Sequence, residues 1–261
     1  MLACDGLTVA YGDREILRQV TLSIPPRGLV GVLGPNGSGK TTLLRALSGA
    51  LTPTSGVVTF DGQPLAQTSR LALARRLAVV PQDTQLAFDY SAIEIVLMGR
   101  YPHLRALEFE GPNDIASAHA ALGATGTDHL ATRAFATLSG GERQRVVIAS
   151  ALAQLGEGTS DAGAHGRALL LDEPTAALDL RYQIEVAALL TRLHDRQDIT
   201  IVLTTHDVHF AARVCSQLIL LGDGQVLAHG APEDVLTTET IASLYGIDAA
   251  HAAPFAMGHR R

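Results

Sequence analysis

A glycine-rich turn at residues 34–41 constrains the fold of this chain more than any other feature of its sequence. An aliphatic run precedes the turn at residues 29–33, and residues 40–49 after it have helical character. The turn consists of Gly34, Pro35, Asn36, Gly37, Ser38, Gly39, Lys40 and Thr41. It matches the pattern G-x-x-x-x-G-K-[S/T] at every fixed position, and it stands between a strand and a helix as that pattern requires. The sequence therefore predicts an α/β fold in which this turn connects a buried strand to a helix.

The turn has the composition of a phosphate-binding loop. Its three glycines let the backbone curl so that several N–H groups point at phosphate oxygens, and the following helix adds its positive dipole end. Lys40 can then reach the β- and γ-phosphates of ATP, the hydroxyl group of Thr41 can bind Mg²⁺, and Thr42 is expected to join the phosphate contacts. The alternative, a glycine-rich turn that binds nothing, does not account for the complete pattern. We therefore expect a P-loop NTPase core.

A second aliphatic run, at residues 168–171, ends in two carboxylates, Asp172 and Glu173. A strand that ends in an acidic residue is the expected second half of a phosphate-loop site. Asp172 is assigned to the magnesium shell, through a water molecule. Glu173 points differently and is assigned as the base that polarises the attacking water. The alternative is a pair of solvated acids, since strand ends often carry charge.

The overall composition narrows the class of protein. The 261 residues carry a formal net charge of −6, which argues against a general nucleic-acid binder. Cys4 and Cys215 lie far apart, so a reducing compartment without a disulfide is the simplest interpretation. We see neither a signal peptide nor a run of the roughly 20 apolar residues that a membrane helix needs. The chain is expected to be soluble and to reach a membrane only through a partner.

Strands dominate the first part of the chain and helices the middle. Segments at residues 7–11, 16–24 and 57–60 alternate or are aliphatic, and they predict an N-terminal antiparallel β region. Helical periodicity from residue 86 to residue 154 predicts a helical subdomain. We expect this subdomain to be inserted into an α/β core made of residues 1–85 and 155–246.

The last part of the chain returns to strands. Residues 199–205 form another aliphatic run, and residues 218–229 have the pattern of a closing hairpin around Asp223 and Gly224. With the runs at residues 29–33, 77–80 and 168–172, these strands predict a mixed sheet. Short helices are expected near residues 232–236 and 238–245. Residues 156–166 are expected to be a surface loop, and residues 247–261 a mobile tail.

The segment Leu138-Ser139-Gly140-Gly141-Glu142 resembles the signature motif of ATP-binding cassette (ABC) transporter ATPases. Physically, Ser139 and the two glycines begin a helix and expose backbone N–H groups, which is an anion site. The resemblance implies that this site closes over the γ-phosphate held by a second copy of the chain, so that hydrolysis requires a homodimer. The alternative is a serine N-cap before an ordinary helix, which would explain Ser139 but not the residues that follow.

The other landmarks of the family appear in the expected order. Tyr11 matches the aromatic residue that stacks on adenine, although a tyrosine in a strand core is the simpler alternative. Gln82 matches the glutamine that senses magnesium, and His206 the histidine that contacts the γ-phosphate. Asp179 matches the short loop that crosses to the other subunit, although residue 176 is Ala where the family frequently has Ser. The resemblance covers residues 7–246 and implies one nucleotide-binding domain over residues 1–261.

One stretch points to a subfamily. Residues 92–103, and above all the run from Val96 to His103, resemble the ATPases of iron–siderophore, haem and cobalamin importers. The family receives a coupling helix of its membrane subunit in a groove of this region, and ordinary packing of the subdomain is the alternative. The expected groove residues are Leu86, Phe88, Tyr90, Arg100 and Tyr101. The polar loop before residue 168 resembles the extra residues that haem-importer ATPases often carry at this place, which favours haem as the cargo.

These resemblances imply an ATPase that works as a homodimer beneath two membrane permease subunits, supplied indirectly by a substrate-binding protein. It would lie peripherally on the cytoplasmic face of the inner membrane, with ATP and Mg²⁺ bound and no nucleic-acid partner. Three alternatives remain. They are a soluble cassette protein of translation or DNA repair, a nucleotide sensor without catalysis, and the separate ATPase subunit of an exporter.

Overall fold

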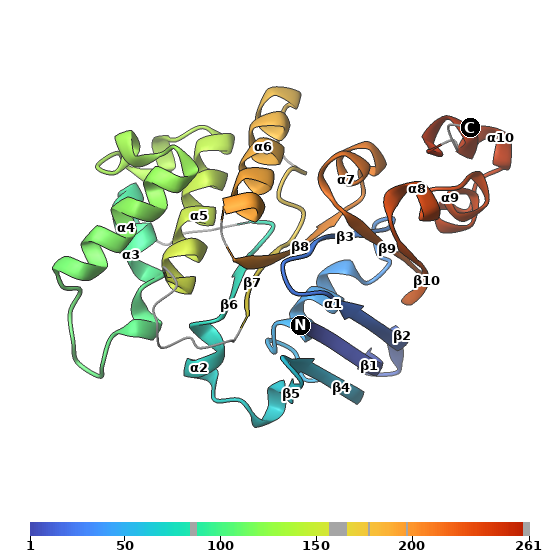
Figure 1. Ribbon diagram of the computed structural model, residues 1–261, viewed down its shortest axis with the longest axis horizontal. Helices are drawn as coiled ribbons and strands as arrows, with labels where there is room; N and C mark the ends of the chain where they lie inside the picture. Colours follow the sequence, from blue (N-terminus) through green and yellow to red (C-terminus); the bar gives the residue numbers. More distant parts are fainter. Residues whose placement is uncertain (84–87, 157–165, 177, 197, 258–261) are drawn as a thin grey trace. The chain divides into compact units, whose positions relative to one another are not determined.

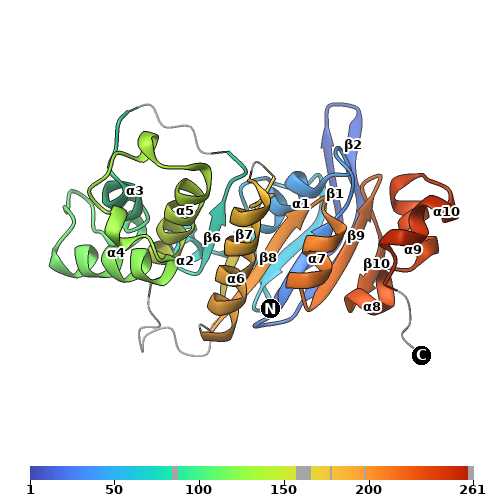
Figure 2. The same cartoon turned by 90° about the horizontal axis from the view of Figure 1, so that it is seen from above.

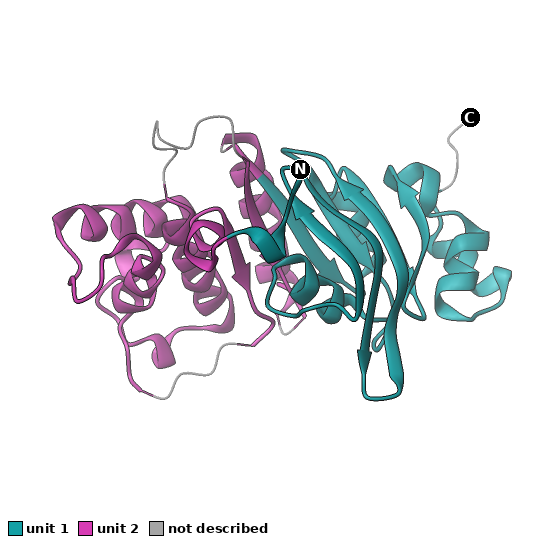
Figure 3. Ribbon diagram, turned by 90° about the horizontal axis from the view of Figure 1, so that it is seen from below, with its two compact units in different colours: residues 1–68, 200–261 teal, residues 69–199 magenta. Residues whose placement is uncertain are grey.

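The computed structural model describes residues 1–83, 88–156, 166–176, 178–196 and 198–257, which form two compact units (Figure 3). One unit contains Met1–Thr68 and Thr200–Arg261, and the other contains Ser69–Ile199. The division differs from the limits that the sequence suggested for a helical subdomain. The strands of residues 77–80 and 167–171 and the long helix of residues 180–196 belong to the same unit as the helices of residues 86–154, because these elements pack on one another.

The first unit contains an antiparallel sheet with the strand order β2-β1-β4-β5 (Figure 1). These strands are β1 (Leu2–Tyr11), β2 (Arg14–Ile24), β4 (Ser55–Phe60) and β5 (Gln63–Pro64). Strands β1 and β2 pair antiparallel, with Leu2 opposite Ile24, and the register shifts at irregularities between Cys4 and Ala10. From Val20 to Ile24 of β2, buried apolar residues alternate with exposed polar residues, as expected for a sheet with one covered face. The predicted N-terminal antiparallel region is confirmed.

The same unit contains strands of a mixed sheet, in the order β10-β9-β3-β8. They are β3 (Leu29–Leu33), β8 (Ile199–Thr205), β9 (Gln217–Gly222) and β10 (Gln225–Gly230). Strand β3 pairs in parallel with β8 and with β9, and every residue of β3 and β8 is buried. Burial on both faces explains why these strands read as uninterrupted aliphatic runs. The predicted mixed sheet is confirmed.

Strands β9 and β10 form the predicted closing hairpin. Gly222 pairs with Gln225, so the turn has the two residues Asp223 and Gly224. Their φ angles are 46° and 75°, which is the geometry of a type I′ turn. This turn lies beside strand β2, since the carbonyl of Gly224 accepts a hydrogen bond at 2.9 Å from the backbone N–H of Arg18.

Five α-helices accompany the strands of the first unit in the described part of the chain. They are α1 (Lys40–Leu47), α7 (Val208–Val214), α8 (Pro232–Val235), α9 (Thr238–Tyr245) and α10 (Ala249–Ala252). Helix α1 contacts β1 and β2, α7 contacts β3, and α8 and α9 contact β9. Helix α1 therefore packs against the antiparallel sheet, and residues 34–39 connect it to the end of β3.

The second unit is mainly helical (Figure 2). Its strands β6 (Leu77–Val80) and β7 (Arg167–Leu171) pair in parallel. Its helices are α2 (Arg70–Ala74), α3 (Ala92–Met98), α4 (Pro112–Thr125), α5 (Gly140–Leu155) and α6 (Leu180–Arg196). Helix α5 is central, because it contacts α3, α4, α6 and both strands. The helical character predicted for residues 86–154 is thus confirmed where the structure describes them.

The expectation of a mobile tail from residue 247 is wrong as far as residue 257. Helix α10 is followed by a short 3₁₀ turn, Ala253–Phe255. The N–H of Met257 donates a hydrogen bond at 2.9 Å to the carbonyl of Leu236, and the rings of Phe255 and His209 lie 5.6 Å apart. These contacts fix the segment against the first unit. The polar loop expected before residue 168 lies largely outside the described residues.

Both cysteines are buried and free, as the sequence suggested. Burial raises the pKa of Cys4 to about 11 and that of Cys215 to about 12. Both side chains are therefore protonated thiols at neutral pH. No helix in the described part of the chain is both long and apolar enough to cross a membrane.

Candidate active site

The predicted phosphate loop lies between β3 and α1 and is closed by two other segments of the first unit. The N–H of Gly34 donates to the carbonyl of Thr205 at the end of β8, at 3.3 Å. The carbonyl of Ser38 accepts from the N–H of Gly224 in the hairpin turn, at 3.1 Å. A third bond, from the N–H of Ser38 to the carbonyl of Pro35 at 3.3 Å, curls the loop on itself. The loop is therefore preformed.

Two of the loop glycines are required by geometry. A Cβ atom on Gly34 would lie 2.2 Å from the carbonyl oxygen of Leu221 and 2.6 Å from Oγ of Ser38, so no side chain fits. Gly39 is the N-cap of α1 and has a φ of 103°, a conformation that L-amino acids with side chains rarely adopt. The backbone can thus approach a ligand closely on the way into the helix.

Lys40 places a buried positive charge over this loop. Its side chain is only 5% exposed. Its Nζ donates to the carbonyl oxygens of Gly34 at 2.9 Å and Pro35 at 3.1 Å. Helix α1 has no acidic residue in its first turn, so an ammonium group and a helix N-terminus meet without an anionic side chain from that turn. This arrangement attracts an anion.

The remaining residues of the loop are placed to contact such an anion. Oγ of Ser38 is buried and has no hydrogen-bond partner in the described part of the chain. Asn36, Gly37 and Thr41 are exposed, and Thr42 is half-buried. An unsatisfied buried hydroxyl beside a positive helix end fits a phosphate group, which would supply the missing acceptor.

A hollow of about 510 Å³ opens beside the exposed side of the loop. It is lined by Asp13, Arg14, Glu15, Ile16, Arg18, Gly37, Asp223 and Gly224. Tyr11, at the end of β1, is 49% exposed, so the alternative of a core tyrosine is wrong. The ring of Tyr11 is therefore accessible, although Tyr11 does not line this hollow.

His206 lies at the same end of the sheet as the loop. It follows Thr205, which pairs with Leu33, the last residue of β3. The side chain of His206 is exposed, and its carbonyl accepts a hydrogen bond at 3.0 Å from the hydroxyl of Tyr245. The first unit thus brings the phosphate loop and the predicted γ-phosphate histidine together. Nothing in the sequence pattern pointed to Tyr245, because its partner is a backbone atom.

In the second unit, Asp172 and Gln82 follow two neighbouring parallel strands. Leu171 of β7 pairs with Val80 of β6, and the N–H of Asp172 donates to the carbonyl of Val80 at 2.9 Å. Asp172 is buried and Gln82 is exposed. Their backbones therefore reach the same edge, where a carboxylate and an amide oxygen can serve a hard cation such as Mg²⁺.

Glu173 has an uncommon backbone conformation. Its φ is 42°, in the left-handed region, which costs a residue with a side chain of order 1 kcal/mol or more. The carbonyl of Glu173 accepts from the N–H of Ala176 at 3.2 Å, so the chain turns immediately after β7. Strain of this kind concentrates at functional sites.

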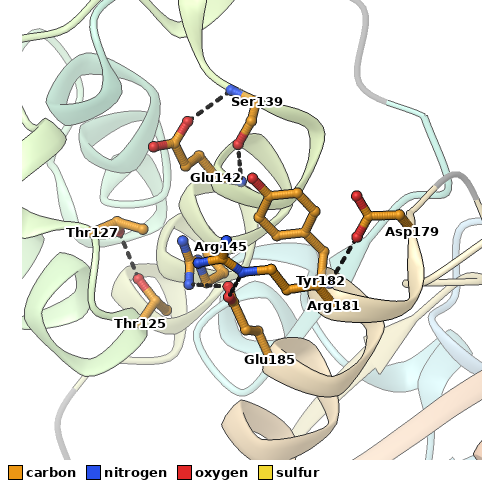
Figure 4. Close-up of polar contacts among 9 residues, drawn as sticks. All are labelled: Thr125, Thr127, Ser139, Glu142, Arg145, Asp179, Arg181, Tyr182 and Glu185. Carbon is orange, nitrogen blue, oxygen red and sulfur yellow. Dashed lines mark hydrogen bonds and ion pairs between the residues drawn. The ribbon is translucent and has the colours of Figure 1, made fainter.

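Asp179 begins helix α6. Its Oδ1 accepts a hydrogen bond at 3.1 Å from the N–H of Tyr182, and the side chain is exposed (Figure 4). This is N-cap geometry. Ala177, which precedes it in the predicted loop, lies outside the described residues. Asp179 therefore has a local structural role besides the one that the resemblance implies.

The signature segment begins helix α5. Ser139 is the N-cap, and the N–H of Glu142 donates to its Oγ at 3.3 Å. The carboxylate of Glu142 in turn accepts from the N–H of Ser139 at 2.7 Å, which completes a capping box (Figure 4). These bonds from the Ser139 backbone and side chain lower the pKa of Glu142. The expectation that a cap could explain only Ser139 is wrong, because Glu142 belongs to the same cap.

The cap leaves the two glycines unexplained. Gly140 is exposed, whereas Gly141 is buried beneath the ring of Tyr182. Predicted site residues thus fall into two groups, each gathered within one unit. The first unit holds Tyr11, residues 34–42 and His206, and the second holds Gln82, Ser139, Gly140, Gly141, Asp172, Glu173 and Asp179.

The residues expected to line the groove differ in how exposed their side chains are. The side chain of Arg100 is only 11% exposed. Its Nε bonds Asp114 at 3.0 Å and its Nη1 the carbonyl of Ala153 at 2.7 Å. Arg100 is therefore not free to line a groove, because it closes the C-terminal end of α5. Phe88 and Tyr101 are 71% and 57% exposed, Tyr90 is half-buried, and Leu86 lies outside the described residues.

Comparison with known proteins agrees with this geometry. The family model for the ABC transporter matches residues 17–176. The chain is 43% identical over 242 residues to the hemin import ATP-binding protein of Myxococcus xanthus, covering 93% of this chain and 88% of the relative. It is 42% identical over 240 residues to the cobalamin import ATP-binding protein of Halobacterium salinarum, covering 92% of this chain. The chain spans only 57% of the length of that second relative.

Solved structures give the same result. A transporter described as of the metal-chelate type, in an inward-facing conformation, has a TM-score of 0.79 at 32% identity, covering 94% of this chain and 88% of that one. The dimeric bacterial ABC transporter cassette MJ0796 has a TM-score of 0.75 at 28% identity, covering 89% of this chain and 99% of that one. The chain therefore belongs to the ABC transporter family.

Proposed function

We propose that this chain is the ATP-hydrolysing subunit of a membrane importer whose cargo is haem, cobalamin or an iron–siderophore. The preformed loop at residues 34–41, with the buried ammonium of Lys40 over it, is the observation that carries ATP binding. The similarity to hemin and cobalamin import ATP-binding proteins supports the importer class. Residues 1–261 would act as a single nucleotide-binding domain.

Each proposed role follows from chemistry at the described positions. The loop backbone, Lys40 and His206 hold the phosphates, and Tyr11 offers an exposed ring to adenine. Water attacks the γ-phosphorus, its proton passes to the carboxylate of Glu173, and ADP leaves with the bridging oxygen. The left-handed φ of Glu173, directly after Asp172, is the strained backbone that supports this assignment.

Magnesium fits the donor set of the two groups of residues. Thr41, Gln82 and Asp172 offer hydroxyl, amide and carboxylate oxygens, which are the donors that Mg²⁺ prefers. The bound ion would neutralise charge on the β- and γ-phosphates. Asp172 is suited to this role because its carboxylate is buried at the end of a strand.

The active form would be a homodimer. Ser139, Gly140 and Gly141 begin a helix and would meet the γ-phosphate bound by the second copy, while Asp179 lies in the loop that crosses between copies. The dimeric state of the related cassette MJ0796 supports this assembly. An isolated monomer would then bind ATP but hydrolyse it slowly.

The dimer would sit beneath two permease subunits, peripherally on the cytoplasmic face of the inner membrane. A substrate-binding protein would deliver cargo to those permeases, and no nucleic acid would take part. Exposed Phe88 and Tyr101 would contact a coupling helix. Proteoliposomes that hold this chain and its permease should take up hemin, cobalamin or a ferric siderophore when ATP is present. ATP-driven export instead would contradict the importer class.

Replacement of the proposed base tests the enzymatic assignment. Glu173→Gln should keep ATP binding, lower phosphate release by about a thousandfold, and accumulate an ATP-bound dimer in sedimentation experiments. Lys40→Ala should lose ATP binding itself. Glu233→Gln, an exposed residue on α8, is the matched control and should behave as wild type. Normal turnover by the Glu173→Gln variant would refute the assignment.

A further inference from the structure

Tyr182 of α6 packs flat against the signature segment at the start of α5. A Cβ atom on Gly141 would lie 2.2 Å from Cδ1, 2.6 Å from Cγ and 2.9 Å from Cε1 of that ring. The close-up view shows the ring beside the first turn of α5 (Figure 4). Only glycine leaves room for this contact, so Gly141 is explained by Tyr182 rather than by its own backbone, whose φ lies outside the left-handed region.

A second contact joins the same two helices one turn further along. Arg145 lies four residues after Gly141, and Glu185 three residues after Tyr182, so each pair shares one face of its helix. Nη1 of Arg145 donates to Oε2 of Glu185 at 2.9 Å, and both side chains are largely covered. Nε of Arg181 bonds the other oxygen of Glu185 at 3.1 Å. The ring and the ion pair therefore fix α6 against α5 at two successive turns.

The residues just before Tyr182 also contact Tyr182 itself or the signature segment. The N–H of Tyr182 is bound by the carboxylate of Asp179, so the residue that covers Gly141 is also part of the cap at Asp179. Cδ2 of Leu178 would lie 3.4 Å from a Cβ atom on Gly140. Tyr182 thus covers Gly141, whereas Leu178 comes within contact distance of Gly140, which stays exposed. Tyr182 touches both the signature segment and the Asp179 loop, a name used for Leu178 and Asp179.

We propose that Tyr182 is a positioning residue that holds the signature segment and the Asp179 loop of one chain together as one surface. This inference rests on the proposed function, in which both segments face the nucleotide site of a second copy. Tyr182 does not touch ATP. Its ring sets the direction of the first turn of α5, and a rotation of that turn would move Ser139 and Gly140 away from the partner's γ-phosphate.

The test uses the full chain carrying Glu173→Gln, in which ATP alone should produce the dimer. Tyr182→Ala in this background should raise the ATP concentration needed for half-maximal dimer formation by about ten- to a hundredfold, measured by sedimentation velocity. ATP binding by the monomer, followed with a fluorescent ATP analogue, should stay unchanged. Tyr182→Phe keeps the ring that packs on Gly141 and should dimerise like its parent.

A variant that fails to fold does not end the test. Tyr182→Leu keeps the apolar volume but loses the flat ring, so it should show the same shift in ATP concentration while melting close to the parent. The inference is overturned if Tyr182→Ala or Tyr182→Leu dimerises at the parent's ATP concentration, or if ATP binding by the monomer weakens equally. If the Glu173→Gln parent itself never dimerises with ATP, the proposed function fails instead.

Discussion

The hydroxyl group of Tyr245 donates a hydrogen bond to the carbonyl oxygen of His206, at 3.0 Å. The bond joins the last residue of α9 to the turn after β8, next to the phosphate loop. Burial, together with the negative charge of Asp207, raises the pKa of Tyr245 to about 12. The hydroxyl therefore remains a donor throughout the physiological pH range, and the helix acts as a support for His206.

Removal of this hydroxyl should slow catalysis without weakening ATP binding. In Tyr245→Phe the backbone at His206 loses one hydrogen bond, and kcat should fall about two- to tenfold, as expected for one neutral bond. Phosphate release measured over a range of ATP concentrations separates kcat from KM. Tyr101→Phe, which alters an exposed ring of the second unit, is the control. A rise in KM with an unchanged kcat would contradict a positioning role for Tyr245.

The same substitution at two glycines should have opposite effects. Gly34→Ala places a methyl group 2.2 Å from the carbonyl of Leu221, so the loop must move. We expect this variant to lose ATP binding and about 1–3 kcal/mol of stability. Gly123→Ala lies in α4 with nothing within 4 Å of the new atom, and it should gain about 0.5–1 kcal/mol. Urea unfolding and ATP titration check both. Equal effects would mean that the contact at Gly34 is unimportant.

Arg100 should be important for stability rather than for docking. Arg100→Met removes the partner of the largely covered Asp114 carboxylate and a donor to the end of α5, so it should cost about 3–5 kcal/mol. The double variant Arg100→Met with Asp114→Asn should recover part of this loss, since no unpaired charge remains. Arg18→Ala, in an exposed pair with Glu15, should change stability by less than about 1 kcal/mol. Denaturant midpoints measure all three, and a neutral Arg100→Met would refute the assignment.

His103 should make the fold more sensitive to acid. Burial, helped by the charges of Arg100 and Arg75, lowers its pKa, although its bond to the carbonyl of Gln154 opposes the shift. The unfolded chain then binds more protons than the folded chain below the ordinary histidine pKa of about 6.5. Stability from this group is complete above that pH and is lost as the pH falls toward the lower folded pKa.

The corresponding measurement compares melting temperatures between about pH 7.5 and pH 5.5. Over this interval His103→Gln should lose less stability than wild type. The difference between the two should be smaller than the ~1.4 kcal/mol per pH unit that uptake of one whole proton would give, because the ring is partly exposed. Gln225→Asn, on an exposed position of β10, changes no titratable group and should leave the slope as it is. An identical slope in wild type and in His103→Gln would show that another group controls the acid response.

Elements specified by short local patterns could be predicted from the sequence. Strand β8 and helix α9 begin and end where expected, because an aliphatic run and a Thr cap with a following Gly define them. Helix α6 was not predicted, although Val186, Leu189, Leu190 and Leu193 repeat at helical spacing. That periodicity was a usable signal.

Other features depend on contacts between distant residues. Arg100 turns inward because the end of α5, more than fifty residues later, offers it a carbonyl. The tail is ordered because Phe255 and Met257 meet His209 and Leu236. The role of Gly141 becomes visible only with Tyr182 in place. Arg100 and Gly141 belong to patterns visible in the sequence, but only packing shows which atoms they touch.

The bond between Gly224 and Ser38 also sets an order of events during protein synthesis. Ribosomes extend a chain by about 5–20 residues per second, so roughly 10–40 s separate the appearance of the loop from that of the turn which closes it. Until residue 205 is added, the nascent chain carries its glycine loop without the carbonyl of Thr205, and until residue 224 is added it also lacks the β9–β10 turn. A ribosome that stalls before residue 205 would therefore release a fragment that contains the motif but lacks the structural partners that hold it in shape.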